Sequence, residues 1–170
     1  MNKELIEIYS KEADSFAVGF IVYENNKYLL INAVDDQGKY DGYLLFSKTF
    51  IEKIERNTAY LNKLIKYMDF WSNISIGKSD NDIYKNTPSF KDLISYAKEN
   101  EKIISIGKSS EYFDFLTGYV SKIEAKGLML DAIDTNTAEI YSSFYVNFDE
   151  IKVLEIDSID SYLLKLTERG

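Results

Sequence analysis

The stretch FAVGFIVYENNKYLLINAVDD, residues 16–36, returns in altered form 99 positions later as FLTGYVSKIEAKGLMLDAIDT, residues 115–135. Six of the 21 aligned pairs are identical: Phe16/Phe115, Gly19/Gly118, Lys27/Lys126, Leu29/Leu128, Ala33/Ala132 and Asp35/Asp134. Unrelated sequences would share about one identity over this length. The chain is therefore predicted to be a tandem duplication of one small domain.

Apolar runs separated by polar turn residues predict five short strands in each copy. They fall at residues 5–8, 16–23, 28–34, 42–46 and 50–54, and again at 103–106, 115–123, 128–133, 140–146 and 148–156. Five short strands joined by tight turns in this length favour a small closed barrel. The predicted class is mainly β with helices (α+β).

A helix is predicted after each set of strands, because apolar residues recur there at the spacing of one helix face. The two stripes are Leu61, Leu64, Ile65 and Met68, then Ile159, Tyr162, Leu163 and Leu166. A short helix beginning at Pro88-Ser89, with Phe90, Leu93, Ile94 and Ala97 on one face, is predicted in the connecting segment. The predicted units are 1–68, 69–101 and 102–170. We expect them to pack together, since about seventy residues is near the lower limit for an independent core.

Interior strand glycines, Gly19 and Gly118, resemble the glycine that bends the long second strand of the Sm-like (SH3-type) small barrel. The Phe-x-x-Gly-aromatic opening, the Ala-[Val/Ile]-Asp turn and Tyr40-Asp41-Gly42-Tyr43 also resemble an uncharacterised family of small proteins from low-GC Gram-positive bacteria. The second copy has Ile140-Tyr141-Ser142 in place of Asp-Gly-Tyr. The resemblance implies two tandem barrels, each followed by a helix, and brings no known activity.

RNA binding by an Sm-like barrel is one alternative function. RNA-binding Sm proteins carry an Asn in the third-strand region and an Ile-Arg-Gly sequence; Asn32 matches the first, but Asp131 replaces it in the second copy and Ile-Arg-Gly is missing. The chain has 20 basic and 28 acidic residues and a net charge of −8, which repels phosphate backbones. The cations Lys48, Lys53 and Arg56 lie near Glu52 and Glu55 in the sequence. We therefore predict little or no RNA binding.

The residue types that most often carry out catalysis are scarce. There is no Cys and no His, which removes thiol nucleophiles, disulfides and the usual general base. Carboxylates at Asp35, Asp36 and Asp134 could bind a divalent cation, but their place in turns predicts bonds to backbone N–H groups instead. We expect no metal, no cofactor and no enzyme activity, and a carboxylate-based enzyme is the third alternative.

Two Gly-Lys-Ser sequences, at 77–79 and 107–109, are reminiscent of a phosphate-binding loop. That loop needs a glycine five positions before the second one, and Ser72 and Lys102 stand there instead. The sequences are therefore interpreted as turns.

Aromatic residues are abundant, and they include Tyr40, Tyr43, Phe46, Phe50, Trp71, Tyr141, Phe144 and Tyr145. Such side chains stack on bases, fill strand faces or form protein interfaces. The leading hypothesis is a non-enzymatic binding module for a protein partner, of the adaptor or immunity type. Barrel edge strands would also allow a homo-oligomer. The lack of a signal peptide or a long apolar stretch predicts a soluble cytoplasmic protein without a membrane anchor.

Overall fold

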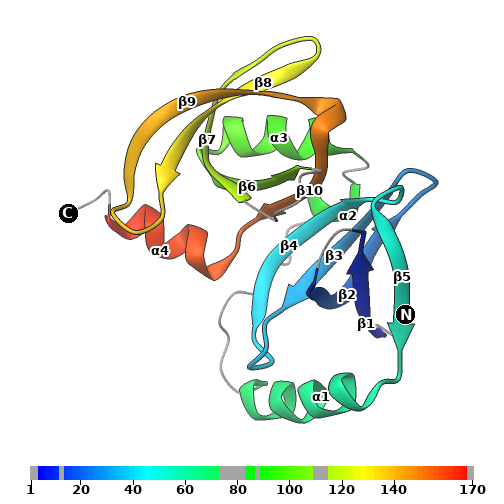
Figure 1. Cartoon of the computed structure of the whole chain (residues 1–170). Helices are drawn as coiled ribbons and strands as arrows, with labels where there is room; N and C mark the ends of the chain where they lie inside the picture. The colour runs from blue at the N-terminus through cyan, green and yellow to red at the C-terminus, as the bar shows by residue number, and fades with distance from the viewer. Residues whose placement is uncertain (1–3, 12–13, 73–82, 87–88, 109–114, 168–170) are drawn as a thin grey trace.

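The computed structural model describes residues 4–11, 14–72, 83–86, 89–108 and 115–167, and most of them lie in strands (Figure 1). The strands are β1 (Leu5–Ser10), β2 (Phe16–Glu24), β3 (Tyr28–Val34), β4 (Tyr40–Ser47), β5 (Ile51–Arg56), β6 (Ile103–Lys108), β7 (Phe115–Ile123), β8 (Gly127–Asp134), β9 (Glu139–Asn147) and β10 (Ile151–Ile156). The helices are α1 (Ala59–Trp71), α2 (Ile83–Asn86), α3 (Phe90–Glu99), α4 (Ile159–Thr167) and a 3-10 turn, η1 (Phe148–Glu150). Among the described residues, no helix is long and apolar enough to cross a membrane.

All ten strands belong to one antiparallel sheet with the order β5-β1-β2-β3-β4-β10-β6-β7-β8-β9. The first five strands and the last five have the same internal order, β5-β1-β2-β3-β4 and β10-β6-β7-β8-β9. In Figure 1 the first five lie below and the second five above, with α1 at the lower end.

The prediction of two closed Sm-like or SH3-type barrels is wrong. Two closed barrels would need β4 to pair with β5 and β9 to pair with β10. The sheet is open because β4 pairs with β10 instead, which leaves β5 and β9 at its two ends. The register places Phe46 opposite Val153, Leu45 opposite Leu154, Leu44 opposite Glu155 and Tyr43 opposite Ile156. The fourth strand of the first half is thus joined to the fifth strand of the second half, so one sheet runs through both halves.

The positions of the predicted strands are confirmed, except that residues 148–150 form the η1 turn before β10 begins. The two interior glycines occupy corresponding places, since Gly19 pairs with Ala33 and Gly118 with Ala132. A Cβ on either glycine would lie 2.4 Å from the carbonyl oxygen of Asn32 or 2.1 Å from that of Asp131. Each glycine therefore permits a close backbone approach between neighbouring strands.

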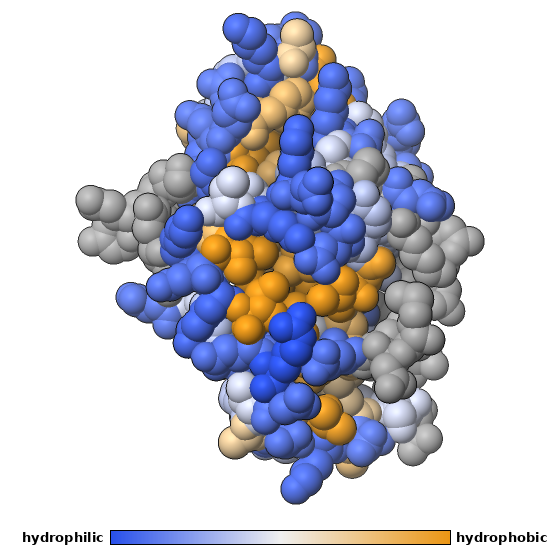
Figure 2. All heavy atoms as spheres, turned by 90° about the vertical axis from the view of Figure 1, so that its right-hand side faces the viewer, coloured by the Kyte–Doolittle hydropathy of each residue, from blue (hydrophilic) through white to orange (hydrophobic). Residues whose placement is uncertain are grey.

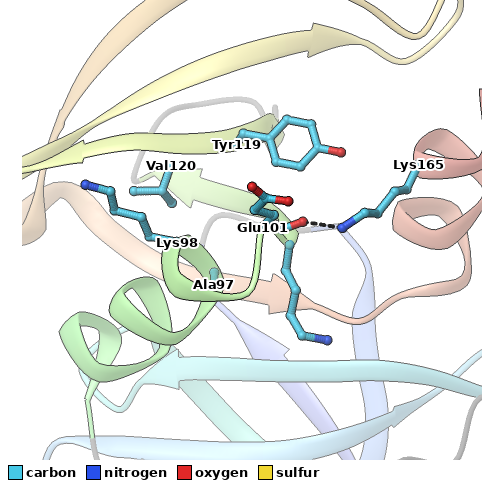
Figure 3. Close-up of a pocket in the computed structure, with 7 residues that line it drawn as sticks. Ala97, Lys98, Glu101, Tyr119, Val120 and Lys165 are labelled. Carbon is cyan, nitrogen blue, oxygen red and sulfur yellow. Dashed lines mark hydrogen bonds between the residues drawn. The ribbon is translucent and has the colours of Figure 1, made fainter. Parts of the chain in front are cut away.

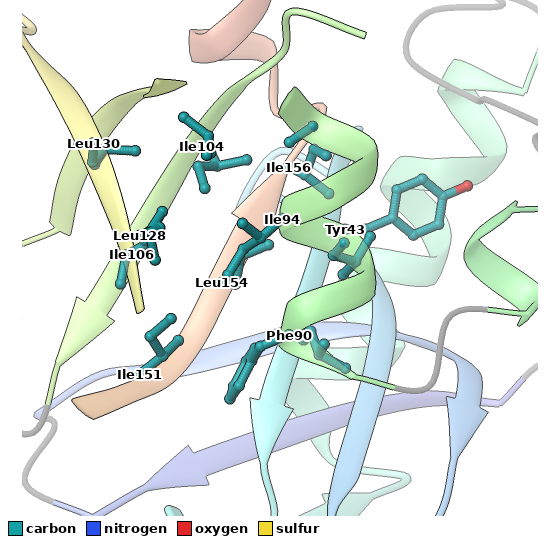
Figure 4. Close-up of a cluster of buried hydrophobic side chains, with 14 of the residues drawn as sticks. Tyr43, Phe90, Ile94, Ile104, Ile106, Leu128, Leu130, Ile151, Leu154 and Ile156 are labelled. Carbon is teal, nitrogen blue, oxygen red and sulfur yellow. The ribbon is translucent and has the colours of Figure 1, made fainter. Parts of the chain in front are cut away.

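Helix α3 packs mainly on β6, β7 and β10 of the second half, and its first residue, Phe90, meets Tyr28 of the first half edge-on (Figure 4). Its N-cap is Ser89, whose Oγ accepts the Asp92 N–H at 3.3 Å, and its predicted apolar face is buried as expected. The cluster around it contains Leu45 of β4, Leu130 of β8 and Leu154 of β10. Each such side chain contributes roughly 1.5–3 kcal/mol when fully buried. The expectation that both halves and the connecting segment pack together is confirmed.

Helices α1 and α4 begin alike but are buried differently. Thr58 and Ser158 accept the N–H groups of Leu61 and Ser161 at 3.1 and 3.2 Å, as Ser and Thr caps do. The α1 stripe packs Leu61 and Leu64 on Leu5, Val18 and Val34. In α4 the inward residue is Ser161, while Tyr162, Leu163 and Leu166 are at least half exposed. The predicted helix is present, but most of its apolar stripe faces solvent.

The backbone of β4 approaches the end of β10 most closely at Gly42. This residue has a φ of +75°, and an added Cβ would lie 2.4 Å from the Ile156 carbonyl oxygen and from the Asp157 carbonyl carbon. Both the left-handed conformation and the close approach require glycine. The corresponding residue of β9 is the exposed Ser142, since Asn32 pairs with Tyr43 as Asp131 pairs with Ser143.

We expect Gly42→Ala to lower the free energy of unfolding by at least about 2 kcal/mol, because a left-handed alanine alone costs roughly 1–2 kcal/mol and the clash with β10 adds to it. Urea denaturation followed by the fluorescence of Trp71, the only tryptophan, measures the change. The matched control, Ser142→Ala, should change stability by less than about 0.5 kcal/mol. Equal effects at the two positions would contradict the described β4–β10 contact.

Candidate functional site

A polar junction lies where β10 ends. Asp157 follows the strand with a left-handed φ of +60° and is buried. Its carboxylate accepts a hydrogen bond from the Tyr84 hydroxyl and forms an ion pair with Lys102, with Nζ 2.6 Å from Oδ1. Burial favours a neutral lysine, but the bond to Asp157 and the charge of this carboxylate outweigh it and raise the pKa of Lys102. One carboxylate thus joins α2, the start of β6 and the end of β10.

Tyr84, in the single-turn helix α2, is fully buried. Its ring stacks on that of Tyr43 with centroids 3.9 Å apart and meets Tyr96 edge-on at 5.9 Å. Burial, followed by the hydrogen bond to Asp157, raises the pKa of Tyr84, so the phenol stays protonated and donates. The residue therefore holds α2 between the two halves.

The first half has a simpler turn at the corresponding place. Asn57 also has a left-handed backbone, with a φ of +57°, but it is exposed. Sequence reasoning did not find the Tyr84–Asp157–Lys102 group, because these residues lie 73 and 55 positions apart and form no spacing pattern. The group joins the connecting segment, through Tyr84, to the second half.

A pocket of about 340 Å³ opens beside Lys102 (Figure 3). Its lining combines cationic, acidic and aromatic side chains: Ala97, Lys98, Glu101, Lys102, Tyr119, Val120 and Lys165. Lys165 donates to the backbone carbonyl of Glu101 at 2.5 Å, which ties α4 to the end of α3. Since Lys102 is bonded to Asp157, two of the three lysine amines already serve the structure. The pocket therefore does not present an assembled catalytic group.

A second carboxylate near the end of β10, Glu155, is partly buried. Burial raises its pKa, and the charge of Asp41 adds to this, while hydrogen bonds from Ser158 and Ser105 act in the opposite direction. Asp41 is itself held by the N–H of Ile159, which its Oδ1 accepts at 2.7 Å. These groups fasten β4, β6 and the start of α4 to β10.

Two of the carboxylates considered as cation ligands, Asp35 and Asp134, bond to backbone N–H groups of turns, as predicted. Asp35 Oδ1 accepts the N–H groups of Gln37 and Lys39 at 3.0 and 2.8 Å. Asp134 Oδ1 accepts the N–H of Asn136 at 2.8 Å. Within the described ranges, no group of three or more Asp or Glu side chains is arranged to hold a metal ion.

The remaining polar candidates also have structural partners. Asn32 donates to the Gly42 carbonyl at 2.9 Å, and Asp131 accepts from Ser121 and Ser143 at 3.0 and 2.6 Å. Lys108 lies 3.5 Å from Glu150. Residues 77–79 and Ser109 lie outside the described residues.

The predicted basic group is neutralised by nearby acids. Lys48 pairs with Glu24 at 2.5 Å, and Lys53 with Glu55 at 2.8 Å. Arg56 pairs with Glu4 at 3.2 Å. These pairs leave little concentrated positive charge for a phosphate backbone.

The aromatic candidates separate into two groups. Tyr43, Phe46 and Phe50 are buried, and the Trp71 indole donates to the Gln37 carbonyl at 2.8 Å. By contrast, all three aromatics of β9 are exposed: Tyr141 at 59%, Phe144 at 38% and Tyr145 at 42%. The surface candidates thus come from one strand.

Strand β9 is an unusual edge. It is the last strand of the sheet and, in the part of the chain that the structure describes, it pairs only with β8. Residues 140–148 contain no charge, although charges are the commonest protection of an edge strand. Ile140, at 56% exposure, adds a fourth large apolar side chain to this strand. The uncharged run could have identified this surface from the sequence.

Comparisons with known proteins do not assign the chain. No protein-family model matches it. Neither a search of curated proteins nor a search of solved structures found a similar chain.

We expect Tyr84→Phe to lower the free energy of unfolding by about 1–2 kcal/mol, because it removes one hydrogen bond to a buried carboxylate and keeps the ring. Urea denaturation measures the loss. Tyr67→Phe, at an exposed position of α1, should change stability by less than about 0.5 kcal/mol. A Tyr84→Phe protein as stable as the original would show that the bond to Asp157 does not stabilise the fold.

Glu155→Gln tests the partly buried carboxylate of β10. A carboxyl group whose pKa is raised on folding favours the folded state when protonated. Its contribution to the free energy of unfolding therefore falls as the pH rises above the pKa of the unfolded chain, about 4.3, and through the raised pKa of the folded state. We expect the Gln variant to gain stability relative to the original chain over this pH range, by urea denaturation at several pH values. Glu52→Gln, at an exposed position of β5, reports the effect of losing a charge elsewhere. A Glu155→Gln difference that does not change with pH would contradict the argument.

Proposed function

We propose that this chain is a non-enzymatic protein-binding module and that β9 is its binding strand. The partner would contribute an extended segment that adds to the sheet beside β9. The observation that carries the proposal is the combination of an open edge, an uncharged run and four exposed large apolar side chains.

Strand addition suits this edge for physical reasons. An edge strand presents a row of N–H and C=O groups, and a partner backbone can bond to them whatever its side chains. Exposed aromatic side chains then add contact area and selectivity, because they bury much apolar surface with few rotatable bonds. The edge of β9 offers both components, whereas the pocket beside Lys102 has two of its amines bonded within the protein.

We further infer that the two halves arose by duplication of one five-strand unit. The repeated sequence, the equal internal strand order and the corresponding pairs Gly19–Ala33 and Gly118–Ala132 support this inference. Under this view β9 is the counterpart of β4, which is a paired strand in the same molecule.

A displayed library of linear nine-residue peptides, the length of β9, tests the proposed function. Selection on the immobilised full chain should enrich peptides with apolar residues at alternate positions. Phe144→Lys and Tyr145→Lys should weaken their binding by about tenfold or more, since charged side chains replace central aromatic contacts.

The control is Leu166→Lys, which makes the same change in charge at a residue of α4 that is 65% exposed. It should leave peptide affinity unchanged. Selected peptides that bind the β9 variants and the original chain equally well would refute β9 as the binding strand.

A further inference from the structure

We propose that the segment which adds to β9 is β5 of a second copy of this chain, in the register that β10 uses on β4. This inference rests on the proposed function, because it names the partner of the same strand. Its basis is that the molecule already contains the proposed contact once, between its own two halves.

The exposed residues of β9 occupy the positions that β10 covers in β4. Phe144 and Tyr145 pair with Leu130 and Met129 of β8. In the first half, Leu44 and Leu45 pair with Ile31 and Leu30 of β3 in the same way.

β10 lies beside those two leucines, with Glu155 opposite Leu44 and Leu154 opposite Leu45. Leu45 is fully buried, whereas Tyr145 at the corresponding place is 42% exposed. The uncovered positions on β9 are therefore those that a fifth strand covers elsewhere in the same sheet.

The free fifth strand is β5. Ile54 pairs with Ile8 of β1 as Leu154 pairs with Ile106 of β6, so β5 is the counterpart of β10. β5 ends the sheet, and in the described ranges it pairs only with β1. Applying the β4–β10 register to two copies places Ile54 opposite Tyr145, Glu55 opposite Phe144 and Arg56 opposite Ser143.

The surroundings of β5 suit an apolar partner. Ile51 and Ile54 are only partly buried against the cluster formed by β1, β3, β4 and β10. β5 lies on the right of Figure 1, and Figure 2 shows that this side of the molecule has an apolar area in its middle, surrounded by hydrophilic residues. An apolar area with a polar rim is typical of a protein interface.

The charges of β5 are compatible with this pairing. The strand has two glutamates and two cations, so its net charge is zero. Lys53 is paired with Glu55 and Arg56 with Glu4, so no partner charge is needed to neutralise them. The β4–β10 contact also tolerates an acid at the same place, because Glu155 lies opposite Leu44. Paired charges on β5 discourage unspecific strand addition and leave a defined partner possible.

A contact between two different surfaces of identical chains is heterologous, so it generates closed rings or open filaments of several chains. In an open filament, each added chain would cover one β9 and one β5, and the filament would keep one free β5 and one free β9 at its ends. The inference therefore predicts assembly beyond the dimer.

Disulfide cross-linking tests the register, and the chain has no cysteine of its own to interfere. Arg56→Cys and Ser143→Cys, both at exposed positions, are prepared as separate full-length proteins and mixed under mild oxidation. Residues directly opposite in an antiparallel pair have Cα atoms about 4.5–5.5 Å apart, within the range of a disulfide. We expect these two variants to form a covalent heterodimer.

The matched control replaces Ser143→Cys by Tyr141→Cys, two residues along the same strand and also exposed. Its diagonal separation of about 7–8 Å should prevent efficient bridging. Equal cross-linking of both mixtures would overturn the register. Cross-linking of Ser143→Cys with itself in preference to Arg56→Cys would overturn the choice of β5 and indicate pairing of β9 with β9.

Analytical ultracentrifugation over a concentration series supplies the second measurement. The original chain and Leu166→Lys should sediment as assemblies, and Tyr145→Lys, which places a lysine opposite Ile54, should raise the dissociation constant by about tenfold or more. A monomer at every concentration, together with no 56–143 disulfide, would overturn the inference. If selected peptides still bound β9 in that case, the proposed function would stand and only the identity of its partner would be wrong.

Discussion

The pairing of β4 with β10 is the interaction on which the rest of the structure depends. It joins two five-strand units that would otherwise each have two unpaired edges. It also brings side chains of both units into one buried cluster, which the apolar face of α3 joins. Asp157 comes directly after the paired part of β10, so the same contact places its carboxylate beside Tyr84 and Lys102.

This pairing also determines which surfaces are left over. Once β4 and β10 are joined, β5 and β9 are the two ends of the sheet. The ends differ in chemistry: β5, with the sequence IEKIER, is charged, whereas β9, with EIYSSFYVN, has one charge at its first residue. Charge protects an edge against unspecific association. The uncharged edge, β9, lacks this protection, and an exposed apolar edge of this kind is typical of a binding surface.

Much of the fold could be predicted from the sequence, since strand positions and the α3 face depend on local apolar spacing. Barrel closure could not, because the same alternation of residues is compatible with pairing inside one unit or between two. The two fifth strands do differ in sequence: IKVLEI of β10 is far more apolar than IEKIER of β5. This difference indicates that β10, and not β5, has neighbouring strands on both sides. At the candidate site, the sequence provided Tyr141, Phe144 and Tyr145, but the residue types alone did not separate them from the buried Tyr43 and Phe46.

The long separation of the two joined strands constrains how the chain reaches its folded state. Phe46 meets Val153, a residue more than a hundred positions later in the sequence. Contacts this distant form slowly, because a large loop must be closed before any of them is gained. During synthesis the edge of β4 emerges long before β10 does and stays uncovered until β10 has also been made. The last strand therefore completes the first half as well as the second, and a ribosome that stopped short of it would release a chain with two unfinished units.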